Sequence, residues 1–120
     1  MNAAPGGSNT PSKKNERRYA RHEVDMRVLV QVFRDGNTVA VWGRSNEMGE
    51  DGISATLTGE LAPGEVVTME FTLPLSTDAM RLRAVVRYRG GFRYGFEFLT
   101  LRDAQRSAIR RALDVLLPGQ

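Results

Sequence analysis

Cysteine is absent from the 120 residues, and His22 is the only histidine. The lack of cysteine excludes disulfides, a thiol nucleophile and thiolate metal ligands. A single histidine without an evident acid partner does not indicate a metal site or a catalytic triad. The carboxylates show no paired arrangement suited to acid–base chemistry. The sequence therefore predicts a protein that is not an enzyme and that holds neither a metal nor a cofactor.

Long hydrophobic runs are also missing. No stretch of the sequence reaches the roughly 18 consecutive apolar residues of a membrane-spanning helix. Residues 1–7 lack the charged and apolar parts of a signal peptide. These absences predict a cytoplasmic protein without membrane insertion. The length of 120 residues is that of one domain.

The net charge of +3 is unevenly distributed. Residues 23–120 carry twelve basic and thirteen acidic side chains. Residues 1–22 contain Glu16 and five basic residues, namely Lys13, Lys14, Arg17, Arg18 and Arg21. A nucleic-acid-binding domain more often spreads its basic residues over a folded surface. The charge pattern favours a small anionic partner and argues against nucleic acid.

The chain divides into a polar tail and a patterned domain. Residues 1–15 are rich in Asn, Ala, Gly, Ser, Pro and Lys without periodicity, which predicts a disordered N-terminal tail before a domain at 16–117. Apolar and polar residues then alternate in six segments, at 24–33, 38–44, 53–58, 66–73, 80–88 and 92–98. Short turns between them favour antiparallel pairing, so we expect an all-β barrel or closed sandwich.

The last segment has helical periodicity. Within residues 101–117, the apolar side chains of Ile109, Ala112, Leu113 and Leu116 form one stripe. Pro118 and Gly119 follow and end the helix. We expect this C-terminal helix to pack across one opening of the barrel.

The central motif is the polar turn between the second and third predicted strands. Glu47, Glu50 and Asp51 lie between glycines in this turn, and an arginine-rich arm lies about thirty residues upstream. An acidic turn and a basic arm on one small barrel indicate a ligand site.

In the order and spacing of these features, the chain resembles a PilZ domain, the bacterial module that binds cyclic di-GMP. The resemblance covers about residues 16–115 and rests on the Arg17-x-x-x-Arg21 arm, the glycine turn, the 92–98 segment and the terminal helix. It implies a six-stranded antiparallel PilZ-like β-barrel with a C-terminal α-helix. It also implies the ligand-binding residues Arg17, Arg18, Arg21, Glu47, Gly49 and Gly52.

The turn departs from the family pattern, which reads Asp-x-Ser-x-x-Gly. With the last glycine aligned to Gly52, Glu47 takes the Asp position and Gly49 takes the Ser position. Arginines suit phosphates and the guanine O6 and N7 atoms, while a carboxylate accepts from guanine N1 and N2. Losing or misplacing these hydrogen bonds weakens binding by roughly tenfold to a thousandfold.

Several functions follow from these patterns. The first is a non-catalytic receptor or adaptor whose arm orders on cyclic di-GMP and presents a surface to a protein effector of unknown identity. The alternative is a divergent PilZ domain that binds proteins without nucleotide. A third hypothesis, nucleic-acid binding, rests on the basic arm together with five arginines of the second hairpin, Arg81, Arg83, Arg87, Arg89 and Arg93.

Simpler interpretations stand beside these. Arg17, Arg18 and Arg21 also fit a solvated basic arm, and Glu47 fits an ion pair with that arm. Gly49 and Gly52 would then serve only to adopt positive φ angles. Trp42 is predicted to be a core or interface residue.

Overall fold

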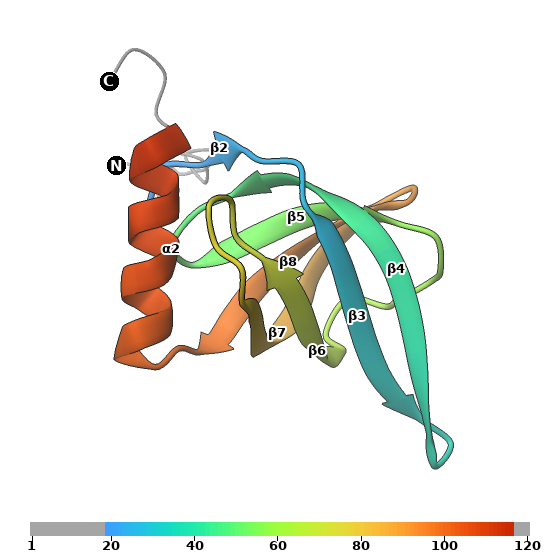
Figure 1. Cartoon of the computed structure of the whole chain (residues 1–120). Coiled ribbons are helices and arrows are strands. Elements are labelled where there is room, and N and C mark those ends of the chain that lie inside the picture. The colour runs from blue at the N-terminus through green and yellow to red at the C-terminus, as the bar shows by residue number, and fades with distance from the viewer. Residues whose placement is uncertain (1–18, 117–120) are drawn as a thin grey trace, which may run out of the picture.

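The computed structural model describes residues 19–116. The predicted tail of residues 1–15 lies outside them. Every predicted strand is present, together with one short additional strand, and the helix follows (Figure 1). The elements are β2 (His22–Glu23), β3 (Arg27–Arg34), β4 (Asn37–Met48), β5 (Gly52–Leu57), β6 (Val66–Thr72), β7 (Ala79–Gly90), β8 (Arg93–Thr100) and α2 (Asp103–Leu116).

The strands form a closed barrel. The sheet order is β2-β4-β3-β6-β7-β8-β5, and the additional pairing of β4 with β5 joins its ends. All pairings are antiparallel. The predicted six-stranded antiparallel barrel with a C-terminal helix is thereby confirmed. No helix within residues 19–116 is long and apolar enough to span a membrane.

The core follows the predicted alternation. On β3, Val28, Val30 and Val32 are buried, and on β6, Val67, Met69 and Phe71 are buried. Side chains alternate between the two faces of a strand, so these residues fill the barrel while their neighbours face outward. β4 is longer than predicted and continues to Met48 through a bulge between Ser45 and Glu47.

A buried serine joins the arm to the barrel. Residues 24–26 connect β2 to β3 and belong to neither strand. The Ser45 hydroxyl accepts a 2.8 Å hydrogen bond from the Met26 amide and donates to the Val24 carbonyl. The Ser45 amide donates to the Met26 carbonyl over 2.8 Å. These bonds hold the segment after the arm on β4.

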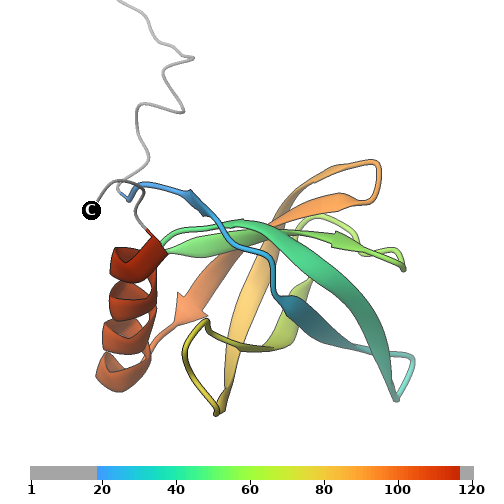
Figure 2. The ribbon, with the colours of Figure 1, turned by 45° about the horizontal axis from the view of Figure 1, so that its top comes forward.

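The helix α2 stands against one end of the barrel, where β2 and the β4–β5 turn also lie (Figures 1 and 2). Ile109, Ala112 and Leu113 are buried in the same core as the strands. The helical stripe therefore packs on the barrel as predicted.

A cluster of hydrogen bonds among three residues holds the end of β3 at Arg34. Arg34 donates from Nε and Nη2 to the two carboxylate oxygens of Glu65, at 3.1 and 2.8 Å. The Ala62 amide donates to Glu65 Oε1 at 2.7 Å. Chiefly because of the Arg34 hydrogen bonds, the pKa of Glu65 lies below its ordinary value.

We expect Glu65→Gln to lower the free energy of unfolding at pH 7 by roughly 1 kcal/mol. A lowered folded-state pKa means that the stabilisation is present above the unfolded pKa and is lost as pH falls through the folded value. Denaturant unfolding at pH 7 and in the acid range below about 4 tests this. The difference from wild type should shrink at the lower pH. Glu60→Gln is the control, because the Glu60 side chain is 77% exposed and its 3.7 Å ion pair with Arg89 contributes little in solvent. An equal effect of both changes would contradict the stabilising role of Glu65.

Candidate functional site

The acidic turn connects β4 to β5 at a tight approach. The Gly49 amide donates to the Gly52 carbonyl over 2.9 Å. An added Cβ at Gly52 would lie 2.3 Å from the Phe96 carbonyl oxygen on β8. Neither Gly49 nor Gly52 has a positive φ, so the interpretation that these glycines serve for positive φ is wrong. Gly52 is required because the backbone of β8 passes too close for any side chain.

Arg21, from the predicted arm, lies on this turn. A Cβ added at Gly49 would lie 2.9 Å from the Ala20 carbonyl oxygen and 3.0 Å from Arg21 Cδ. The Arg21 side chain is only 17% exposed, and its Nη2 lies 3.7 Å from Asp51 Oδ1. The arm therefore packs in the space that a side chain at position 49 would occupy.

This ion pair is incompletely satisfied. Arg21 Nε and Asp51 Oδ1 are both buried, and neither has a hydrogen-bond partner among residues 19–116. A buried polar atom without a partner costs about 1–3 kcal/mol. An oxygen-rich anion would complete the hydrogen bonding of Arg21.

Beside the arm, paired residues on the outer face of neighbouring strands form a row, called here the outward row. The strand registers place Glu47 opposite Ser54, Ser54 opposite Gly95, and Gly95 opposite Tyr88. Arg93 joins this row, because its Nη2 lies 3.4 Å from Ser54 Oγ and 4.0 Å from Glu47 Oε1. The ion-pair partner of Glu47 within the described residues is thus a strand arginine.

Tyr88 adds an aromatic surface to the row. A Cβ at Gly95 would lie 1.9 Å from Tyr88 Cε2, so the ring covers the Gly95 backbone. Tyr88 is 47% exposed. Strict alternation would place it inward with Val86, but a bulge between Val86 and Tyr88 turns it outward. Sequence reasoning missed Tyr88 for this reason.

A cavity of about 610 Å³ lies next to Glu47. Asp25 accepts a 2.6 Å hydrogen bond from Arg44 in its wall, and this bond raises the pKa of Arg44. The charged residues that line this cavity are Glu23, Asp25, Arg44, Glu47 and Arg93. Carboxylates can accept from a purine edge, guanidiniums can donate to purine acceptors or phosphate, and an exposed ring can stack.

The turn is also attached to the helix. Arg110 on α2 donates to Glu50 in the turn, with Nη2 3.1 Å from Oε1. This hydrogen bond is the main cause of the raised pKa of Arg110. Glu50, which lies between the candidate ligand residues in sequence, therefore anchors α2.

The structure brings four predicted site residues together at one barrel end: Arg21, Glu47, Gly49 and Gly52. Arg17 and Arg18 lie outside the described residues. Trp42 is half-exposed with the Arg27 guanidinium 4.6 Å from its ring centroid, so the core interpretation is wrong for it. Within residues 19–116, no group of His, Asp and Glu is arranged to hold a metal.

The arginine stripe of the second hairpin is largely neutralised. Arg81 pairs with Glu70, Arg87 with Glu97, Arg89 with Glu60 and Arg93 with Glu47, at 3.8, 2.6, 3.7 and 4.0 Å. Paired charges give a weaker field for a phosphate backbone than free ones. This pairing argues against the nucleic-acid hypothesis.

A family model described as "PilZ domain" matches residues 15–114. The chain belongs to the PilZ domain family, and the predicted resemblance is confirmed. A search among curated proteins gives no match.

Solved structures share the fold. The PilZ domain of CeSA from a cellulose-synthesizing bacterium has 19% identity and a TM-score of 0.62, with 81% of this chain and 97% of that chain covered. The PilZ domain of Escherichia coli YcgR with c-di-GMP has 18% identity and a TM-score of 0.65, with 84% and 91% covered. The Bacillus subtilis inhibitor of motility MotI/DgrA has 18% identity and a TM-score of 0.66. The match covers 88% of this chain but only 53% of that protein.

We expect Gly52→Ala to destabilise the fold by about 2 kcal/mol or more, because the added methyl group collides with the Phe96 carbonyl oxygen. Gly90→Ala is the matched control, since a Cβ there meets nothing within 4 Å and its φ is not positive. The control should change stability by less than about 0.5 kcal/mol. Chemical denaturation measures both, and equal stabilities would refute the close-approach role of Gly52.

Proposed function

We propose that this PilZ domain binds cyclic di-GMP at the arm, the acidic turn and the adjacent outward row. In this proposal it is a non-catalytic receptor of the bacterial cytoplasm that passes the signal to a protein effector. Family membership supports the ligand class, and the similar PilZ domain of E. coli YcgR is solved with c-di-GMP.

The observation that carries the proposal is the position of Arg21. It lies against Gly49 and beside Asp51 with a buried, unsatisfied Nε. Cyclic di-GMP offers phosphate oxygens together with guanine O6 and N7, all of which accept from arginine. Because Arg21 Nε is buried, the proposed ligand would have to shift the Arg21 side chain from its place beside Gly49 and Asp51 before accepting a hydrogen bond from Nε.

The outward row supplies complementary groups. Glu47 is half-exposed, and its carboxylate would accept from the guanine N1 and N2 hydrogens. Arg93 would donate to a phosphate or a guanine acceptor, and Tyr88 would stack on a base. Arg17 and Arg18 would add cations from the arm.

We expect Arg21→Ala to weaken cyclic di-GMP binding at least about tenfold, because it removes charged hydrogen bonds. Arg17→Ala should act in the same direction. Isothermal titration of the wild type should give a dissociation constant in the micromolar range or weaker. Arg21→Ala should also lower the melting temperature, because it leaves the buried Asp51 Oδ1 without its counter-ion. The affinity is therefore measured well below the melting temperature of the variant, where the chain is folded.

Arg83→Ala is the matched control for these substitutions, because Arg83 is an exposed arginine on β7. It should leave the affinity unchanged. No heat from the wild type at millimolar ligand would reject nucleotide binding. Equal affinities of Arg21→Ala and wild type would remove Arg21 from the site.

The altered turn gives a separate prediction. Glu47→Asp introduces the aspartate of the family pattern, whose side chain is shorter. It should tighten cyclic di-GMP binding by about tenfold, because one hydrogen bond is regained. Gly49→Ser restores the hydroxyl, but its Cβ would lie 2.9 Å from the Ala20 carbonyl oxygen and would push the arm away. Titration of both single variants should therefore give opposite changes in affinity. A tighter Gly49→Ser variant would show that the arm yields to the serine.

The second candidate is a protein-interaction module without nucleotide. Its support is that Arg21 already has a counter-ion in Asp51 and that the arm fills the space above Gly49. A ligand must compete with both contacts. The same titration separates the candidates, because this one predicts no heat with cyclic di-GMP.

A further inference from the structure

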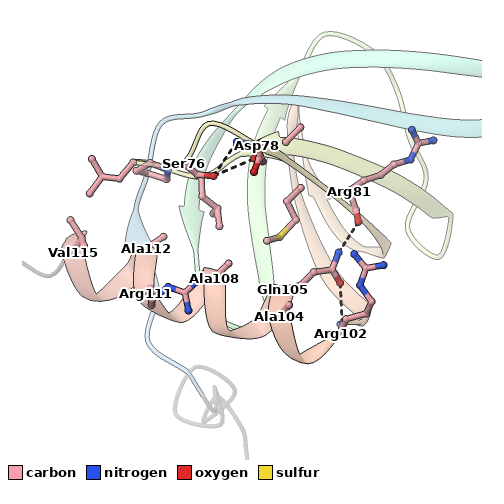
Figure 3. Close-up of a pocket in the computed structure, with 15 residues that line it drawn as sticks. Ser76, Asp78, Arg81, Arg102, Ala104, Gln105, Ala108, Arg111, Ala112 and Val115 are labelled. Atoms are coloured by element: carbon pink, nitrogen blue, oxygen red, sulfur yellow. Dashed lines mark hydrogen bonds between the residues drawn. The ribbon is translucent and has the colours of Figure 1, made fainter.

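A second cavity, of about 860 Å³, lies between α2 and the segment that joins β6 to β7 (Figure 3). Its helical wall carries Ala104, Ala108 and Ala112, spaced four residues apart so that they share one face of α2. Gln105 fixes one end by donating from Nε2 to the Arg81 carbonyl over 2.9 Å. At a rise of about 1.5 Å per residue, the wall from Ala104 to Val115 is about 16 Å long.

Two apolar side chains at this groove are exposed. Leu75 is 86% exposed, and Val115 is also exposed. Leu75 has a φ of 67°, a left-handed conformation that costs a non-glycine residue of order 1 kcal/mol. The left-handed backbone thus holds an apolar side chain in solvent at the edge of the groove.

The groove is bordered by cations. Arg102 and Arg111 line it and are exposed, and no carboxylate of residues 19–116 lies within 4.0 Å of either. Arg81 also lines it, but its guanidinium pairs with Glu70 at 3.8 Å. Asp78 is the only acidic lining residue among those described. The border therefore favours a negatively charged partner.

We propose that this groove binds an acidic amphipathic helix of a partner protein. Ala104 is exposed and Ala108 is half-buried, so their small side chains let the ridges of a second helix approach this part of α2 closely, and the length of the wall accommodates about three turns. Acidic side chains of that helix would pair with Arg102 and Arg111, while Leu75 would insert between its apolar side chains.

Charge distinguishes this occupant from two others. Residues 1–18 of this chain carry four basic residues and Glu16, so they repel the basic border. A second copy that docked through the same groove would bring its own Arg102 and Arg111 against this border. An acidic partner avoids both repulsions.

The test uses two capped peptides of about 15 residues, each with leucines at helical spacing. The first peptide has glutamate at every remaining position, and the second has lysine at every remaining position. The full chain, labelled with ¹⁵N, should show amide shifts at 73–81 and 104–115 with the glutamate peptide. Its affinity should exceed that of the lysine peptide by at least about tenfold.

Two variants make the test specific. Arg102→Glu with Arg111→Glu should reverse the preference, so that the lysine peptide binds more tightly. Leu75→Gly should weaken binding of the glutamate peptide while raising the melting temperature, because glycine relieves the left-handed strain. Cyclic di-GMP binding should be unchanged in Leu75→Gly, since that residue lies outside the proposed nucleotide site.

The proposal is overturned if neither peptide shifts these amides at millimolar concentration, or if both bind equally. It is also overturned if neither peptide binds, while anionic phosphatidylglycerol vesicles bind the wild-type chain and do not bind the variant that carries both Arg102→Glu and Arg111→Glu. That outcome would make the groove a lipid-binding surface.

Discussion

The pairing of β4 with β5 is the constraint on which the rest of the structure depends. It closes the barrel, and its connecting turn is held by the 2.9 Å hydrogen bond from the Gly49 amide to the Gly52 carbonyl. The same turn directs Asp51 to the arm and Glu50 to α2. Because one short segment makes all these contacts, the arm, the helix and the outward row meet at one barrel end.

Strand and helix positions could be predicted because their hydrophobic patterns are regular. Val28, Val30 and Val32 alternate without interruption, and Ile109, Ala112 and Leu113 follow helical spacing. β2 could not be predicted, because a strand of two residues shows no alternation of apolar and polar side chains. Its pairing partner Met48 also lies far along the chain. Bulges are equally hidden, because an extra residue shifts the register without altering composition.

The candidate site was predictable to the extent that it lies in sequence motifs. The arm and the turn predict Arg21 and Glu47, and the structure places both at one barrel end. Arg93 and Tyr88 lie there through register alone, and the bulge before Tyr88 reverses the face that alternation assigns to it. The role of Gly52 depends on the backbone of β8, which the local sequence does not reveal.

The proposed nucleotide site and the proposed docking groove share α2, since Arg110 binds Glu50 and its neighbour Arg111 lines the groove. Mapping the backbone amide shifts of the ¹⁵N-labelled chain during titration with cyclic di-GMP tests the central claim most directly. We expect the largest shifts at 20–23, 47–54 and 93–95, with Tyr88 also affected. Shifts confined to the β3–β4 hairpin, or no shifts at millimolar ligand, would contradict that claim.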